Sequence, residues 1–205
     1  MPTTNNTKER LISTAIELIW QSSYGSVSVD EICKAANVKK GSFYHFFPSK
    51  VDLAVAAMEQ FYQEAKPLFE EVFDRSRSPI ERFEKLAEII LRKQTEVAKQ
   101  YGHVCGCPFA SLGSEMAGQE ALIREKVNKT MKKYKSKYYE QTIQEMIDDG
   151  SLPSDTDVKD KSEQLESYIL GQMMVARIQN DLKPLKKNLK DGLFKILDLT
   201  LEPAG

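Results

Sequence analysis

The sequence predicts an all-α protein of about nine helices, in which a three-helix head precedes a larger helical body. Apolar residues recur every three or four positions along most of the 205 residues, as they do in helices that pack on one side. Two helix-start signals reinforce the prediction, because Ser28 stands three residues before Glu31 and Ser78-Pro79 precedes Glu81. Near the start of the chain, two short helix patterns are separated by a tight break.

The head is predicted from three helix patterns in the first part of the chain. The first pattern can be capped by Asn6 or Thr7 and ends at Tyr24-Gly25. The second starts with the first capping signal and ends at Asn37, a residue type that tolerates left-handed backbone. The third opens with cations and small residues. Two short helices joined by a tight turn in this way are typical of a helix-turn-helix.

The third helix pattern carries the chemistry of an element that binds a DNA duplex. Lys40 can donate to guanine O6 or N7 in a major groove, and Gly41 allows the backbone to approach base edges. Tyr44 and His45 can reach phosphate oxygens, and Lys50 is expected to meet the DNA backbone. A generic three-helix unit with surface lysines is the alternative. The predicted DNA-binding residues are Ser28, Lys39, Lys40, Gly41, Ser42, Tyr44, His45 and Lys50.

These residues carry a family resemblance. The run Gly-Ser-Phe-Tyr-x-x-Phe-Pro-Ser-Lys at residues 41–50, preceded by a capped helix, resembles the DNA-binding domain of the tetracycline-repressor (TetR) family. The resemblance implies an all-helical homodimeric repressor that binds a double-stranded, palindromic operator and is released by a small-molecule effector. It implies a transcription regulator rather than an enzyme, with no cofactor and no metal.

The remaining helix patterns divide the chain into a head of residues 1–50 and a ligand-binding and dimerisation body of residues 51–205. A helix from Ser49 toward Arg75 links the two, and Pro67 predicts a kink or local break in it. The other patterns cover residues 79–101, 109–116, 119–147, 158–181 and 185–201. In the pattern over 119–147, Leu122 is expected on the buried side and Lys135 on the solvent side.

Two sets of body residues are candidates for binding. Aromatic, methionine and cysteine side chains can line an effector cavity, although each also fits an ordinary core; they are Met58, Phe61, Tyr62, His103, Cys105, Cys107, Phe109, Tyr134 and Met173.

The last two helices can form a four-helix interface with a twofold mate, as the resemblance also implies. The predicted dimer residues are Leu165, Tyr168, Ile169, Gly171, Met173, Leu189, Leu193, Ile196 and Leu197.

Cys105-Gly106-Cys107 is the chemically unusual stretch of the body. It can be a thiol sensor of oxidants or electrophiles if a helix start lowers a thiolate pKa, or a strained disulfide switch. With His103 it supplies at most three metal ligands at cramped spacing. Two small buried side chains are the plainest interpretation. A cysteine-dependent enzyme is the alternative from another class, but only two histidines are available to activate a nucleophile.

Charge and cysteine usage limit the remaining choices. The formal net charge of −1 excludes a protein that binds polyanions without selectivity, whereas residues 1–50 hold six basic against four acidic side chains. An odd count of three cysteines argues against a disulfide scaffold and suits a reducing compartment. The polar N-terminus and the lack of a long apolar run predict a cytoplasmic protein without a signal peptide or membrane span.

Overall fold

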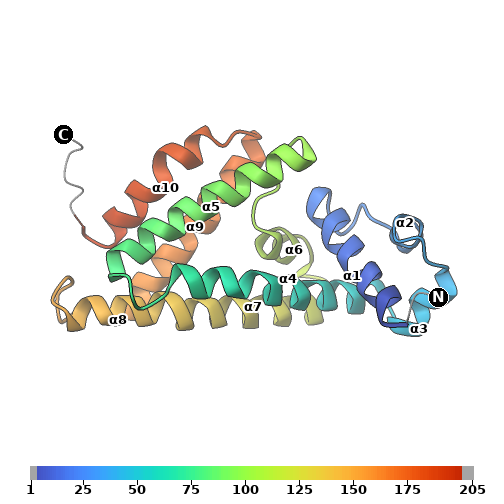
Figure 1. The fold of residues 1–205 in the computed structure, drawn as a ribbon, viewed down its shortest axis with the longest axis horizontal. Coiled ribbons are helices and arrows are strands. Elements are labelled where there is room, and N and C mark those ends of the chain that lie inside the picture. Colours follow the sequence, from blue (N-terminus) through green and yellow to red (C-terminus); the bar gives the residue numbers. More distant parts are fainter. Residues whose placement is uncertain (1–3, 200–205) are drawn as a thin grey trace. The chain divides into compact units, whose positions relative to one another are not determined.

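A computed structural model describes residues 4–199 of the chain, and all regular structure in this range is helical (Figure 1). The prediction of about nine helices is confirmed, because α7, a π-helical segment and α8 follow one another without a break and count as one helix. The elements are α1 (Thr4–Gln21), α2 (Val29–Ala35), α3 (Lys40–Phe46), α4 (Lys50–Val72), α5 (Pro79–Tyr101), α6 (Pro108–Met116), α7 (Ala121–Tyr134), η1 (Lys135–Glu140), α8 (Gln141–Asp148), α9 (Val158–Gln179) and α10 (Lys183–Ile196).

The chain forms two compact units that do not divide at residue 50. The first unit comprises Met1–Lys66 and Pro108–Thr130, and the second comprises Pro67–Cys107 and Met131–Gly205. Most of α4, together with α6 and most of α7, therefore packs with the head. Pro67 lies inside α4, which continues as a helix to Val72, so the expected local break is not found.

The first unit is built around one apolar core shared by its first four helices. Leu11, Ile32, Phe43 and Leu53, one from each of α1 to α4, are fully buried in this core. Burial of four large side chains from four helices fixes α2 and α3 against α1. This core is what holds the short helix α3, which is too short to be stable alone.

Local signals set the helix ends in the first unit. The capping box predicted at α2 is present, since Ser28 accepts from the Glu31 amide and the Glu31 carboxylate accepts from the Ser28 amide. Asn37 adopts the predicted left-handed backbone, with φ of 51°. The start of α1 differs from the prediction, because the helix begins at Thr4 and ends at Gln21, before the turn that contains Tyr24.

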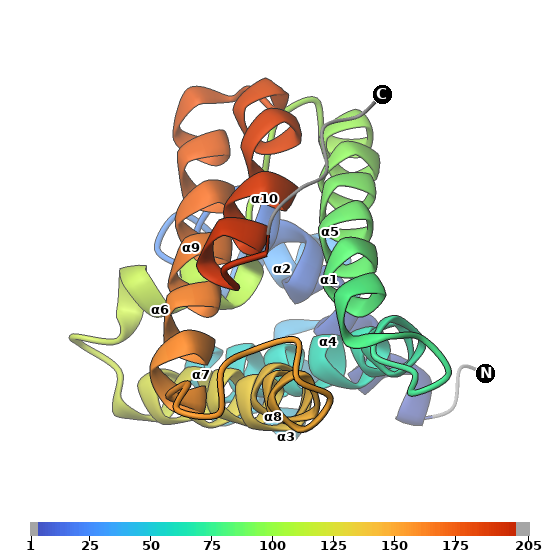
Figure 2. The same ribbon diagram turned by 90° about the vertical axis from the view of Figure 1, so that its left-hand side faces the viewer.

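The second unit is a helical bundle in which α5, α9 and α10 run side by side (Figures 1 and 2). The predicted capping box of Ser78 and Glu81 starts α5, and Gly102 ends it with a left-handed φ of 78°. Gly192 of α10 allows the closest approach in this bundle, because a Cβ there would lie 2.0 Å from the ring of Tyr168 on α9. Nothing in the described part of the chain lies within 4 Å of a Cβ placed on Gly171.

The long helix predicted over 119–147 contains a π-helical segment, η1, which changes the helical repeat between α7 and α8. A π-helical turn contains one residue more than an α-helical turn, so the buried face shifts across this segment. Leu122 is 55% exposed and the neighbouring Ile123 is buried instead, which corrects the prediction for Leu122. Lys135, expected on the solvent side, keeps only 15% of its side chain exposed and pairs with Glu163 of α9.

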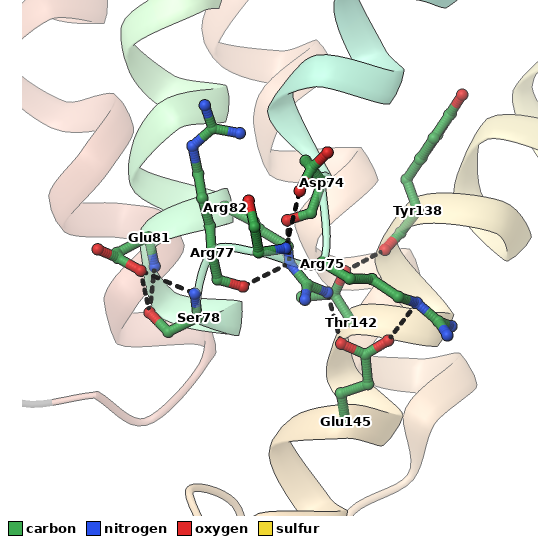
Figure 3. Close-up of polar contacts among 10 residues, drawn as sticks. Asp74, Arg75, Arg77, Ser78, Glu81, Arg82, Tyr138, Thr142 and Glu145 are labelled. Atoms are coloured by element: carbon green, nitrogen blue, oxygen red, sulfur yellow. Dashed lines mark hydrogen bonds and ion pairs between the residues drawn. The ribbon is translucent and has the colours of Figure 1, made fainter.

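A buried ion pair joins the start of α5 to α8 in the second unit (Figure 3). The guanidinium of Arg82, whose side chain is 4% exposed, lies 2.5 Å from a carboxylate oxygen of Glu145. Its Nε also donates to the carbonyls of Asp74 and Arg77, both at 3.1 Å. One side chain thus fixes the loop between α4 and α5 as well as the packing of α5 on α8.

None of the helices within residues 4–199 combines the length and the apolar character needed to cross a membrane.

Candidate nucleic-acid interface and body sites

The recognition helix α3 presents one polar face to solvent. Phe43 is fully buried, which fixes the rotation of the helix about its axis. Lys40, Gly41, Tyr44 and His45 are exposed, and their spacing places them together on the opposite face. The exposed fraction of Tyr44 is 51%, a high value for an aromatic side chain. The structure thus brings together the central part of the predicted DNA-binding set.

Lys40 forms an exposed ion pair with Asp30 of α2. Its Nζ lies 2.8 Å from a carboxylate oxygen of Asp30, and both side chains are more than half exposed. The hydrogen bond and charge of Asp30 raise the pKa of the Lys40 ammonium, so it stays protonated. Exposed pairs of this kind contribute about 0–1 kcal/mol. A base edge or phosphate can therefore compete for this lysine at little cost.

Gly41 is exposed, and no atom of the described chain lies within 4 Å of a Cβ placed on it. Its φ is not in the left-handed region, so neither packing nor backbone strain within the protomer requires glycine there. Close approach of an outside partner to the start of α3 is a physical reason for glycine at this position.

Two residues of the predicted DNA-binding set have structural roles here. Lys50 points into the first unit, where its Nζ donates to the carbonyls of Tyr24 at 2.5 Å and Val27 at 2.6 Å. The expected phosphate contact of Lys50 stays a prediction. The Ser28 side chain is engaged in the capping box with Glu31, whose carboxylate accepts from it at 2.7 Å. Ser42 is half-buried and Lys39 is exposed.

Glu115 of α6 was not selected from the sequence. Its carboxylate accepts hydrogen bonds from the amides of Tyr24 and Gly25 in the turn between α1 and α2. The residues lie 91 and 90 positions apart, so no local pattern connects them. α6 is therefore part of the support of the head.

Two family models match most of the chain. One, described as "Bacterial regulatory proteins, tetR family", matches residues 11–63, and the other, "Tetracyclin repressor-like, C-terminal domain", matches residues 79–191. The chain belongs to the TetR family. The first match contains the exposed face of α3 described above, and the second covers α5 to most of α10. TetR-family proteins are transcriptional regulators rather than enzymes.

Individual relatives agree with this assignment. The transcriptional regulator AcuR of Cereibacter sphaeroides is 37% identical over 109 residues, which cover 53% of this chain and 48% of AcuR, about half the length of that relative. The repressor NemR of Escherichia coli is 24% identical over 190 residues, covering 91% of this chain and 92% of NemR.

Solved structures show the same fold. A regulatory protein TetR from Rhodobacter sphaeroides has a TM-score of 0.76 at 27% identity, over 92% of this chain and 95% of that one. The reduced form of E. coli NemR has a TM-score of 0.79 at 24% identity, over 97% of this chain and 99% of that one. TetR-family structures therefore share both the helix-turn-helix head and the helical body of this chain.

The candidate effector residues are divided between the two units. Met58, Tyr62 and Phe109 are buried in the first unit, where the ring of Phe61 packs edge-on against Phe109 with centroids 5.7 Å apart. In the second unit, Tyr134 contacts the ring of Phe69, with centroids 4.5 Å apart. Met173 is buried in the core of that unit. The set therefore does not form one cluster within either unit.

Side chains of two helices hold the cysteine segment between α5 and α6 through hydrogen bonds to its backbone. Gln94 of α5 both donates to and accepts from Gly106, and Arg177 of α9 donates to the Cys105 carbonyl at 2.8 Å. Cys105 is fully buried, and burial raises the pKa of its thiol against a smaller opposing effect of Arg177. This differs from the lowered pKa that the thiol-sensor hypothesis requires. Cys107 is half-buried.

Neither a disulfide nor a metal site forms at this segment. Neither Cys105 nor Cys107 is in a disulfide, and within residues 4–199 no group of three or more metal-ligating side chains comes together. His103, the third ligand considered from the sequence, is half-buried and its Nδ1 lies 3.1 Å from the Tyr101 carbonyl. The segment is a packed connection between α5 and α6.

Most of the predicted dimer residues are buried in the core of the single chain, and their part in a dimer stays a prediction. The apolar residues of α9 and α10 face each other and α5 within the protomer. Tyr168 donates to the Asn188 carbonyl at 2.7 Å within the same helix pair. The fully or nearly fully buried residues of the predicted set are Leu165, Ile169, Met173, Leu189, Leu193 and Leu197.

The outward face of α9 carries a different apolar stripe. Val175 is 40% exposed and Ile178 is 75% exposed, and Gly171 lies on the same face one turn earlier. Residues at this spacing form a continuous strip along a helix. Of the predicted dimer set, Gly171 belongs to this outward stripe, while Ile196 is half-buried.

Proposed function

We propose that this chain is a homodimeric, effector-responsive repressor that binds a palindromic operator in the cytoplasm. The observation that carries the proposal is the exposed face of α3, on which Lys40, Gly41, Tyr44 and His45 lie together. Two copies place two such helices in successive major grooves about one turn of the duplex apart. Membership of the TetR family and the description of NemR as a repressor support the regulatory role.

Each residue of this face has a distinct proposed part in DNA binding. Lys40 releases Asp30 and donates to guanine O6 or N7, so it reads sequence. Gly41 allows the start of the helix to come close to base edges. Tyr44 and His45 bind phosphate oxygens, which fix the register of the head on the duplex without reading sequence.

In vitro selection of duplexes by the purified protein tests this function directly. We expect a palindromic sequence, and Lys40→Ala should reduce affinity for it by about 1–3 kcal/mol while relaxing preference at one base pair of each half-site. Lys187→Ala on α10 is the matched control, because it removes an exposed lysine from the second unit. Failure to enrich any duplex, or equal binding by both variants, would contradict the proposed role of α3.

We propose that the outward face of α9 forms the dimer interface. Its apolar stripe of Gly171, Val175 and Ile178 is suited to pairing with the same stripe of a twofold mate. Sedimentation analysis should show a dimer, and Ile178→Asp should shift it toward monomer by placing a charge in an apolar contact. Leu122→Asp is the matched control, because Leu122 is also an exposed apolar residue, on α7. A dimer that resists Ile178→Asp would place the interface elsewhere.

The effector must bind two states of the protein with different affinity, because equal affinity shifts no equilibrium. α4 is one proposed lever, since it runs from the head through Pro67 into the second unit. An effector should therefore raise the melting temperature, because it binds the folded protein, and weaken operator binding, because it favours the state that does not bind DNA. A compound that stabilises the protein without changing operator affinity is not the effector.

Thiol sensing is a second candidate trigger, suggested by a solved relative described as a reduced form. Here Cys107 is the accessible candidate, because Cys105 is fully buried. Intact-mass analysis after mild oxidant, beside an operator-binding assay, tests it. Adduct formation on Cys107 with loss of binding, absent in Cys107→Ser, would establish the sensor, and unchanged binding would remove it.

A further inference from the structure

The outward apolar stripe of α9 runs to the very end of that helix. Ile178 is the last residue but one of α9, which ends at Gln179, and Val175 lies about one turn earlier. The Ile178 side chain is 75% exposed, so packing within the protomer does little to fix it. The end of a helix frays more easily than its middle, because its last carbonyls lack partners within the helix. The contacts that hold the last turn of α9 therefore decide whether these two side chains are in place for a second copy.

Asn180 both ends α9 and attaches it to the connection between α5 and α6. Its backbone is left-handed, with φ of 50°, and its amide donates to the carbonyls of Ala176 and Arg177. Its side-chain oxygen Oδ1 accepts a hydrogen bond from the Val104 amide at 2.8 Å. Asparagine tolerates left-handed backbone and also carries an acceptor, whereas glycine has only the first property. The cap of α9 and its attachment to Val104 thus depend on one residue.

A second residue near the end of α9 binds the same connection. Arg177 donates to the Cys105 carbonyl at 2.8 Å. Gly106 follows with a left-handed φ of 69°, and a Cβ on it would lie 3.4 Å both from the Met173 carbonyl oxygen and from the side chain of Arg177. Residues 104–106 therefore lie directly against the last two turns of α9, on the side away from the stripe.

The other side of this connection is anchored to α5. The buried side chain of Gln94 donates to the Gly106 carbonyl at 3.2 Å and accepts from the Gly106 amide at 3.1 Å. Val104 and Cys105 are themselves buried. Residues 104–106, which we call the strap, thus tie the end of α9 to α5, and all of these residues belong to the second unit.

We infer that Asn180 and Arg177 are positioning residues for the dimer interface, and that dimer affinity depends on the strap. This role rests on the proposed dimer contact of α9 and says what keeps that contact in place. While the strap is bound, the last turn of α9 stays helical and presents Val175 and Ile178 together. When the strap is released, the last turn frays and the apolar area offered to the second copy shrinks. Because the dimer is twofold symmetric, each such change occurs twice in one complex.

The first test measures the dimer dissociation constant of the full-length protein by sedimentation. Asn180→Gly keeps the left-handed end of α9 and removes the bond to Val104 in both copies, so the constant should rise by about tenfold. Asn180→Asp should lose less affinity, because it keeps an acceptor at the same place. Asp157→Ala is the matched control, because it removes the cap at the opposite end of α9 and should leave the constant within about twofold of wild type.

The results distinguish the role of the strap from the dimer contact itself. A monomeric wild-type protein, or a dimer that survives Ile178→Asp, contradicts the proposed contact of α9. A dimer that Ile178→Asp breaks, but that Asn180→Gly leaves within about twofold of wild-type affinity, overturns the role of the strap. Equal losses in Asp157→Ala and Asn180→Gly overturn it as well, because any weakening of α9 would then act alike.

Amide hydrogen exchange gives a second readout, which a general loss of stability does not produce. Because coupling between two sites is reciprocal, dimer formation should stabilise the strap as much as the strap stabilises the dimer. The Val104 amide should therefore exchange more slowly in the wild-type dimer than in the Ile178→Asp monomer. The control is the Leu152 amide, which donates to the Met146 carbonyl at 2.9 Å after α8 and should exchange equally in both. Equal exchange of the Val104 amide in the two forms would contradict the coupling.

Discussion

The buried pair of Arg82 and Glu145 allows a stability prediction with a definite size. Glu145→Ala leaves the Arg82 guanidinium in place, because its Nε still donates to the carbonyls of Asp74 and Arg77. The Arg82 side chain is only 4% exposed, so its charge loses the carboxylate in a place that little water reaches. Removing one partner of a buried pair costs about 3–5 kcal/mol, and the partial exposure of Glu145 favours the lower end.

Urea and thermal unfolding of the full chain measure this cost at fixed protein concentration. A loss of about 3 kcal/mol corresponds to a fall in Tm of roughly 6–12 °C for a protein of this size. Glu88→Ala is the matched control, because it breaks an exposed pair with Lys85 and should cost less than about 1 kcal/mol. Replacing both partners, as in Arg82→Met with Glu145→Leu, should recover most of the loss.

Equal losses in Glu145→Ala and Glu88→Ala would refute the reasoning, because the buried and exposed pairs would then contribute alike. A double variant no more stable than Glu145→Ala alone would also contradict it. In that case the loop between α4 and α5 would depend on the hydrogen bonds of Arg82 rather than on charge compensation.

Three further predictions concern the second unit. Gly192→Ala should cost about 0.5–1.5 kcal/mol in urea unfolding, because its Cβ displaces the tip of the Tyr168 ring and its hydrogen bond to the Asn188 carbonyl, whereas Gly118→Ala, with no neighbour within 4 Å, should change stability little. Burial raises the pKa of the Glu166 carboxyl above 4.5. The folded state therefore loses stability as the pH rises and this carboxyl ionises, whereas at low pH the neutral carboxyl causes no such loss. Glu166→Gln should therefore raise Tm at about pH 8 more than at about pH 4, and an equal gain at both would contradict this. Iodoacetamide should label Cys107 before Cys105, because burial raises the pKa of the Cys105 thiol; equal rates by intact mass would count against its burial.

Local chemistry made the head predictable from sequence. The capping box at Ser28 and Glu31 and the left-handed Asn37 each depend on residues within a few positions, and both are present. Phe43 is fully buried, which leaves the polar face of α3 in solvent. A period fixes which side of a helix is apolar, and the preceding helices α1 and α2 cover that side of α3.

The same period could not show what covers an apolar face. Leu165 and Leu193 were assigned to a second copy, whereas the chain buries them against its own helices. Contacts between distant residues were equally hidden, as in the carboxylate of Glu115 on the turn at Tyr24. Lys50 was expected to meet the DNA backbone, and its hydrogen bonds to the carbonyls of Tyr24 and Val27 join residues too distant in sequence for a local pattern to show.

The π-helical segment η1 implies an unusual tolerance to a change in chain length. Deleting one residue from a regular α-helix rotates everything after it by about 100°, which would expose Ile143 and Met146 of α8. Deleting Ser136, inside η1, should instead convert the wide turn to an ordinary one and keep those two side chains buried. Natural sequences of this fold that are one residue shorter in the long helix can therefore align without a shift of the α8 core, provided that the gap falls here.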